Sequence, residues 1–189
     1  MNRLVVALGN PGPEHELTKH NIGWLAVDQL SFHSELRWNS KYRGHFTTYQ
    51  SKLGKVFILK PMTFMNLSGE SVREVVNFFK IPMGDILVVH DELDMDFGKV
   101  AFKKGGGLAG HNGLKSIAKS LGSQDFLRLR LGIDRPPHGN VSSWVLSKFT
   151  SNQDKNLEDF LIYSAGAIEE FMSQGFQKAA GKFSHKMAF

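Results

Sequence analysis

The sequence contains no cysteine among its 189 residues. Disulfide bonds, thiolate zinc sites and a cysteine nucleophile are therefore excluded. The absence is compatible with a cytoplasmic location, which is our expectation, because disulfides belong mainly to oxidising compartments. The chain also lacks a G-x-S-x-G nucleophile elbow, so Ser68 is better interpreted as a helix N-cap than as a nucleophile.

No apolar run approaches the ~20 residues that a membrane-spanning helix needs. The first apolar run, Leu4 to Leu8, is too short for the core of a signal peptide and ends in the turn sequence Gly-Asn-Pro-Gly. We expect it to be a core strand and expect no membrane association. Repeats, low-complexity tracts and linkers are also missing, so residues 1–189 are predicted to form a single domain.

Acidic residues are scarce in one segment. Residues 96–150 carry nine lysines and arginines but only three aspartates, a net charge of +6, although the whole chain carries only +5. One-sided charge of this kind suits a polyanion such as nucleic acid. A solvated basic surface explains it equally well, so the charge alone does not decide between the two.

The spacing of apolar residues predicts an α/β fold. Strands are expected at 3–8, 44–50, 55–59, 85–89, 99–103 and 126–133, with a further strand-like stretch after the polar loop 134–140. Helices are expected at 22–32, 67–80, 113–121, 156–173 and 176–184. The sequence His90-Asp91 then follows a buried strand, at the edge of the sheet where ligands of α/β proteins collect.

His20 and Asp91 are candidates for a catalytic pair. A histidine is a general base near neutral pH, and a carboxylate on its far nitrogen fixes the tautomer and stabilises the charged ring. Each residue alone has an ordinary interpretation, because His20 could cap a helix and Asp91 could be a surface acid. Asp91, Asp94 and Asp96 do not follow the order of a calcium loop, and no metal site is predicted.

Two further segments carry possible site residues. Gly105, Gly107 and Gly110 satisfy G-x-G-x-x-G between a strand and a helix, which allows a dinucleotide site, a close approach to a nucleic-acid phosphate, or a purely structural loop. Core packing would explain Phe64 and Met65, but it does not explain Asn66 beside them.

Four segments together resemble the bacterial peptidyl-tRNA hydrolase family. They are GNPGPEHELTKHNIGW, KPMTFMNLSGESV, ILVVHDELDMDFG and GGGLAGHNGLKSI, and they follow that family's blocks in order over most of the chain. The resemblance implies a single-domain, three-layer α/β/α fold with a mixed, mostly parallel twisted sheet. It also implies hydrolysis of the ester between a peptide and the 3′-terminal ribose of tRNA, without a metal or organic cofactor, by a monomer.

The resemblance implies a role for each matched residue. His20 would activate the attacking water, Asp91 would stabilise the basic form of His20, and Asn10 would contact the peptide and discriminate blocked from free aminoacyl-tRNA. The substrate would be bound by His15, Phe64, Met65, Asn66 and Asn112. The acceptor-stem phosphates would be bound by Lys103, Lys104, Lys115, Arg130 and, less securely matched, Arg128.

The sequence departs from the family pattern at two places. His15 stands where the family usually has tyrosine, and Leu108-Ala109 replaces the more usual His-Gly in the glycine loop. An imidazole can still stack on a base, whereas the polar contact and the mobility of the loop are put in question. Neither departure removes His20.

Two other functions compete with hydrolysis. A non-catalytic RNA-binding protein on the same fold would need only the basic face, and would not require His20, Asp91 and Asn10 together. A nucleotide-dependent oxidoreductase would depend on the glycine loop alone.

Overall fold

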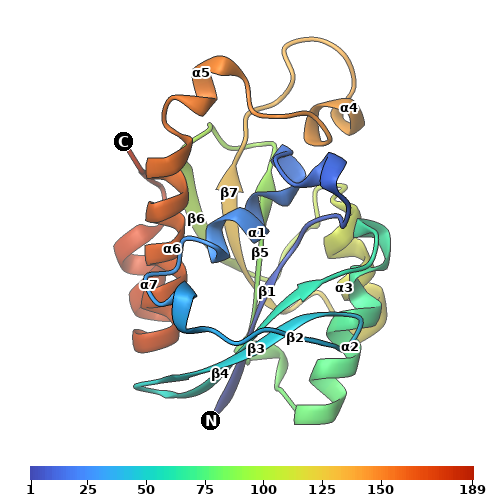
Figure 1. Ribbon diagram of the computed structural model, residues 1–189, viewed down its shortest axis with the longest axis vertical. Coiled ribbons are helices and arrows are strands. Elements are labelled where there is room, and N and C mark those ends of the chain that lie inside the picture. The colour runs from blue at the N-terminus through green and yellow to red at the C-terminus, as the bar shows by residue number, and fades with distance from the viewer.

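The computed structural model describes all residues, 1–189, and contains one eight-stranded mixed sheet (Figure 1). The strand order is β2-β3-β4-β1-β5-β7-β6-β8. The neighbouring strands β4, β1, β5 and β7 run parallel, and antiparallel strands flank them on both sides. The strands are β1 (Asn2–Ala7), β2 (Asn39–Lys41), β3 (Gly44–Ser51), β4 (Gly54–Pro61), β5 (Ile86–Glu92), β6 (Lys99–Lys104), β7 (Leu127–Gly132) and β8 (Lys186–Met187).

Helices cover both faces of the sheet, so the predicted three-layer α/β/α architecture is confirmed (Figure 1). The helices α1, α6 and α7 lie on one face, and α2 and α3 lie on the other. The α-helices are α1 (Ile22–Val27), α2 (Ser68–Phe79), α3 (Asn112–Leu121), α4 (Val141–Val145), α5 (Ser151–Asp154), α6 (Leu157–Gln174) and α7 (Phe176–Phe183). Short 3₁₀ turns are η1 (Pro13–His15), η2 (Lys19–Asn21), η3 (His33–Glu35), η4 (Met65–Leu67) and η5 (Met83–Asp85).

The central strands are buried on both faces, which explains their uninterrupted apolar sequences. In β1, Val5 and Ala7 belong to the core under α1, α6 and α7, whereas Leu4 and Val6 belong to the core under α2 and α3. Alternation of side chains along a strand produces this division. The same alternation in β5 places Asp91 on the face of Leu87 and Val89, on the side where α1 packs.

The buried guanidinium of Arg3 ties β1 to α6. It donates hydrogen bonds to the carbonyl oxygens of Phe171 and Met172, near the C-terminal end of α6, and to Ser51 Oγ. The last carbonyls of a helix carry partial negative charge, so a cation is favourable there. Burial lowers the pKa of Arg3, with Asp85 acting in the opposite direction.

Three local predictions are wrong. The helix expected at 22–32 ends at Val27, where the backbone changes to tighter turns, because Gln29 N donates to the Ala26 carbonyl and Leu30 N to the Val27 carbonyl. Ser68 is the first residue of α2 rather than its N-cap, since its hydroxyl donates to the Met65 carbonyl and accepts no backbone N–H. The stretch after residue 140 is the helix α4, whose N-terminus is capped by the Asn140 side chain at Ser143 N.

The remaining predicted strands and helices occur within one or two residues of their expected positions, apart from extensions at strand ends. The structure also contains no helix that is both long enough and apolar enough to cross a membrane.

Candidate active site

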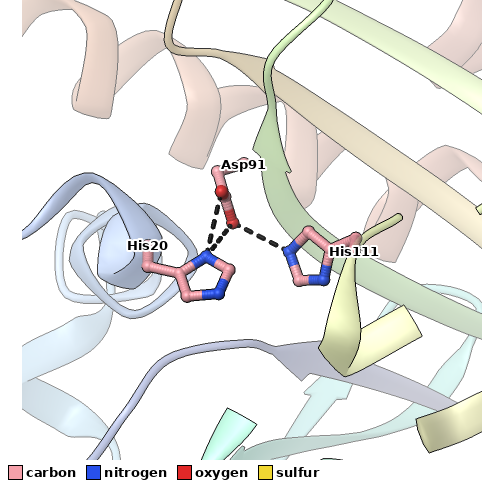
Figure 2. Close-up of side chains that lie close together, drawn as sticks. All are labelled: His20, Asp91 and His111. Carbon is pink, nitrogen blue, oxygen red and sulfur yellow. Dashed lines mark hydrogen bonds and ion pairs between the residues drawn. The ribbon is translucent and has the colours of Figure 1, made fainter. Parts of the chain in front are cut away.

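His20 and Asp91 lie together at the C-terminal end of β5. Asp91 is the penultimate residue of this strand and is buried, and His20 lies in η2, which leads into α1. The Nδ1 atom of His20 is 2.9 and 3.0 Å from the two carboxylate oxygens of Asp91 (Figure 2). With Nδ1–H donated to Asp91, Nε2 carries the free lone pair of the neutral ring. The expected pairing is therefore present, whereas the catalytic roles stay predictions.

The pair is arranged so that each partner favours the charged form of the other. Burial lowers the pKa of His20, but the charge of Asp91 and its hydrogen bond outweigh burial and raise that pKa above 6.5. Burial would raise the pKa of Asp91, yet His20 and His111 together hold it well below its usual range. Asp91 thus stays ionised, and His20 can take up a proton near neutral pH.

A second histidine, His111, completes a cluster around Asp91. Its Nε2 is 2.9 Å from Asp91 Oδ1 (Figure 2). Its Nδ1 accepts hydrogen bonds from the backbone N–H groups of Gly113 and Leu114. His111 is therefore the N-cap of α3. Because Nδ1 accepts from the backbone, the ring carries its proton on Nε2 and donates it to Asp91.

His111 was not among the predicted site residues. Serine, threonine, aspartate and asparagine are the usual N-caps, so a histidine before a glycine-containing helix gives no clear signal in a sequence. The only signal is its position directly before Asn112, which was predicted to bind substrate. Only the fold shows that the start of α3 meets the end of β5.

Asn10 is fixed by two sets of hydrogen bonds. The side chain of Asn21 accepts a hydrogen bond from the Asn10 backbone N–H at 2.8 Å and donates one to the Asn10 carbonyl at 3.0 Å. Asn10 Oδ1 accepts the backbone N–H of Met65 at 2.8 Å. Because this bond requires an oxygen acceptor, it fixes the orientation of the amide and leaves its NH₂ group as a donor on a residue that lines the cleft. Asn21 was not predicted to hold Asn10.

These residues line a cleft of about 670 Å³. One wall contains the predicted residues Phe64, Met65 and Asn66, and Asn112 contributes from the start of α3. Phe64 is 64% exposed although it is a large apolar residue, so it is available to a ligand. Another part of the lining was not predicted and contains Leu93 together with Val141, Ser142, Val145 and Leu146 from α4 and its end.

The other predicted binding residues lie outside the cleft. His15 is half-buried in η1. Lys103 and Lys104 end β6, Arg130 lies on β7 across from Ala101, and Lys115 is exposed on α3. We call these four basic residues of β6, β7 and α3 the basic edge.

Arg128 differs from the other basic residues predicted to bind tRNA in being buried. Its side chain is 2% exposed, and it donates a hydrogen bond to the Gly105 carbonyl, which holds the start of the glycine loop against β7. Arg128 also borders the cleft, and its expected contact with tRNA stays a prediction.

The glycine loop lacks the structural context of a dinucleotide site. It follows β6, which runs antiparallel to both of its neighbours, whereas the dinucleotide motif follows a parallel strand of a βαβ unit. Gly105, Gly106 and Gly110 have φ values of 63°, 85° and 74°. Left-handed backbone of this kind explains the glycines as turn residues.

A metal ion could be considered at the histidine cluster. Ligand atoms of His20, Asp91 and His111 lie within 4.8 Å of one another. Nδ1 of His20 and Nε2 of His111, however, each donate to Asp91, and the remaining nitrogen of His111 accepts backbone N–H groups. The same atoms therefore already serve a hydrogen-bonded network that is complete without a metal.

Comparisons with known proteins agree with this geometry. The family model described as peptidyl-tRNA hydrolase matches residues 4–188. A peptidyl-tRNA hydrolase of Citrifermentans bemidjiense is 43% identical over 183 residues, covering 96% of this chain and 97% of the relative. One from Bacillus cereus is 42% identical over 188 residues, covering 96% and 99%.

A solved structure shows the same fold. The crystal structure of peptidyl-tRNA hydrolase from Acinetobacter baumannii superimposes with a TM-score of 0.89 at 34% sequence identity, covering 99% of this chain and 96% of that one. The match therefore extends through both helical layers and the whole sheet. On the family model, the sequence identity and the shared fold together, the chain belongs to the peptidyl-tRNA hydrolase family.

Proposed function

We propose that His20 is the general base in the hydrolysis of peptidyl-tRNA, the reaction of the family to which the chain belongs. The observation that carries this proposal is the buried hydrogen bond from His20 Nδ1 to Asp91, which leaves Nε2 as the proton acceptor beside the cleft. Nε2 takes a proton from water while the water oxygen attacks the ester carbonyl. The resulting imidazolium, stabilised by Asp91, then returns the proton to the departing ribose oxygen.

The amide of Asn10 supplies selectivity for blocked substrates. With its oxygen bound to Met65 N–H, it presents N–H donors to the cleft. A peptide carbonyl, present next to the esterified residue only in a blocked substrate, accepts such a hydrogen bond. A free α-amino group is a charged donor and is not matched by another donor.

The remaining predicted residues divide into two groups. Phe64, Met65, Asn66 and Asn112 hold the peptide and the 3′ end of the tRNA within the cleft, where apolar contact and amide hydrogen bonds are both available. His15, outside the cleft, stacks on the tRNA end.

The basic edge binds the acceptor stem. Lys103, Lys104, Lys115 and Arg130 place positive charge on β6, β7 and α3 without contributing to the cleft, and basic residues outside a reaction cleft suit phosphate contacts that position a nucleic acid. We further propose that the protein acts as a cytoplasmic monomer without a cofactor.

The proposal is tested by the release of amino acid from N-acetylated aminoacyl-tRNA, with unblocked aminoacyl-tRNA as a second substrate. Rapid release from the blocked substrate alone, lowered by about 10²-fold or more in kcat in His20→Ala, is expected for loss of a general base. His45→Ala is the matched control, because His45 is exposed on β3. Near-normal turnover in His20→Ala would refute the mechanism.

The rival function, RNA binding without catalysis, makes the opposite forecast for the wild-type protein. It requires tight, salt-sensitive binding of tRNA with no release from either substrate. The satisfied hydrogen bonds around His20, Asp91 and Asn10 favour the enzyme, since phosphate binding needs none of them.

A further inference from the structure

The ammonium group of Lys19 is buried directly beside the catalytic segment. Lys19 begins η2, precedes His20, and has 0% exposure, although lysine is almost never fully buried without partners. Burial lowers the pKa of Lys19 to about 8, with the charge of Asp134 acting in the opposite direction. The proposed reaction assigns this buried charge no role.

The contacts of Lys19 all lead to one segment. Its Nζ donates to Ser147 Oγ at 2.8 Å and to the Lys148 carbonyl at 2.7 Å. The same atom lies 3.8 Å from the centroid of the Trp144 ring, a cation–π contact. The backbone is joined as well, because Lys19 N donates to the Ser147 carbonyl at 3.0 Å.

The segment that Lys19 holds carries a wall of the cleft. Ser147 Oγ, which accepts from Lys19, also donates a hydrogen bond to the Trp144 carbonyl at 2.6 Å, at the C-terminal end of α4. This short helix and its end contribute Val141, Ser142, Val145 and Leu146 to the lining of the cleft. Figure 1 shows α4 above the catalytic end of the sheet, following a long loop.

Few other contacts hold α4 in place. The residues of the preceding loop from Pro137 to Asn140 are exposed, and so are Val141 to Ser143. Trp144 Nε1 donates to the Asp134 carbonyl at 2.8 Å, and Val145 packs into the core. The position of the wall therefore depends on the side of α4 that faces η2, where Lys19 lies.

We propose that Lys19 is a positioning residue that fastens the α4 wall of the cleft to the segment bearing His20. It holds the wall through two charged hydrogen bonds and a cation–π contact, all of them on the C-terminal side of α4. A charge that is costly to bury is retained because an apolar side chain could fill the space but could not make these bonds. The effect on catalysis depends on the proposed function, whereas the effect on α4 does not.

The experiment compares Lys19→Met with wild-type protein. Methionine keeps an unbranched stem between Trp144 and Phe149 and removes the donors. The matched control is Lys148→Met, because the Lys148 side chain is exposed and only its backbone carbonyl receives Lys19. Lys19→Arg tests whether a charged donor at this position restores the wild-type behaviour.

Hydrogen exchange of the backbone N–H groups of Trp144, Leu146 and Ser147 reports directly on the wall. Lys19→Met should lower their protection by about tenfold, the effect of one charged hydrogen bond, while the protection of α6 stays unchanged. Unchanged protection at these three groups would overturn the proposal. If Lys19→Met does not fold, Ser147→Ala removes one of the acceptors and should give a smaller loss confined to the same groups.

Kinetics with N-acetylated aminoacyl-tRNA separates positioning from general destabilisation. Lys19→Met should raise KM by about tenfold with a smaller change in kcat, since the wall contacts bound substrate and His20 keeps Asp91. Lys19→Arg should recover most of the affinity. An equal loss in Lys148→Met would refute the role of the ammonium. Absence of turnover in the wild-type protein would refute the proposed function and leave the exchange test intact.

Discussion

The histidine cluster and the basic edge are two polar regions built in opposite ways. His20, Asp91 and His111 are buried or nearly so, lie within 4.8 Å of one another, and meet through hydrogen bonds of 2.9 to 3.0 Å. Lys104 and Lys115 are exposed and have no ion pair. In the basic edge only Arg130 has an acidic neighbour, Glu92, at 3.9 Å.

The difference matches two physical demands. Proton transfer requires a fixed tautomer and a fixed distance, which burial and several hydrogen bonds provide. Binding of phosphates requires charge of one sign at roughly the right place, and exposed flexible cations suffice. Substitutions should therefore act on rate in the cluster and on affinity at the basic edge.

The largest effect is expected for Asp91→Ala. Loss of the carboxylate removes the group that orients His20 and stabilises its charged form, so kcat should fall by about 10²-fold or more with little change in tRNA binding. The exposed Asp94, paired with Arg135, provides the control Asp94→Ala. Comparable losses of kcat in the two variants would show that the overall charge, and not the histidine cluster, causes the effect.

Substitutions of His111 should have an intermediate effect on kcat. Two variants can separate its hydrogen bond to Asp91 from its role as the N-cap of α3. His111→Ala removes both the bond to Asp91 and the N-cap of α3, and should cost about tenfold in kcat and about 1 kcal/mol in the free energy of unfolding. His111→Asn retains a capping side chain, so the stability should return while the rate stays low. Recovery of both quantities in His111→Asn would show that only the cap matters.

At the basic edge, Lys103→Ala and Arg130→Ala should weaken tRNA binding severalfold. Each should reduce the slope of log affinity against log salt by about one, and neither should change the cleavage of a minimal 3′-end substrate. Lys52→Ala, in the exposed turn between β3 and β4, is the control. If the minimal substrate is cleaved as slowly as the full tRNA substrate, the division between the regions fails.

The pH dependence of stability distinguishes the buried Lys19 from the exposed lysines. Its pKa is about 8 in the folded protein against 10.5 ordinarily, so between these pH values the unfolded chain holds a proton that the folded chain has lost. The free energy of unfolding therefore gains a contribution that rises with pH over this range. Urea denaturation should show that Lys19→Met lacks this rise, whereas Lys148→Met keeps it.

Much of the fold and part of the site could be predicted from local sequence. The buried strands β1 and β5 are continuous apolar runs, and α3 and α7 have strong helical periodicity, so their patterns specify them directly. The early end of α1 at Val27 is set by backbone turns there, and the Ser68 hydroxyl turns back to the Met65 carbonyl. The spacing of apolar residues specifies neither feature.

The same division applies to the site. His20, Asp91 and Asn10 were named from motifs, and the structure brings them to one cleft. The α4 wall, the cap formed by His111 and the burial of Arg128 and Lys19 depend on how separate segments pack. The sequence does not specify whether a basic side chain is exposed to solvent, donates to a carbonyl or packs on an indole ring.

The most direct test is the pH dependence of the single-turnover rate on N-acetylated aminoacyl-tRNA, measured for wild-type protein and Asp91→Asn. The wild-type rate should rise through one ionisation whose pKa lies above 6.5, because Asp91 raises the pKa of His20. In Asp91→Asn, burial acts without the compensating charge, so the residual activity should titrate at lower pH. An inflection that stays in the same place in both proteins would contradict the assignment of His20 and Asp91 as the base and the group that sets its pKa.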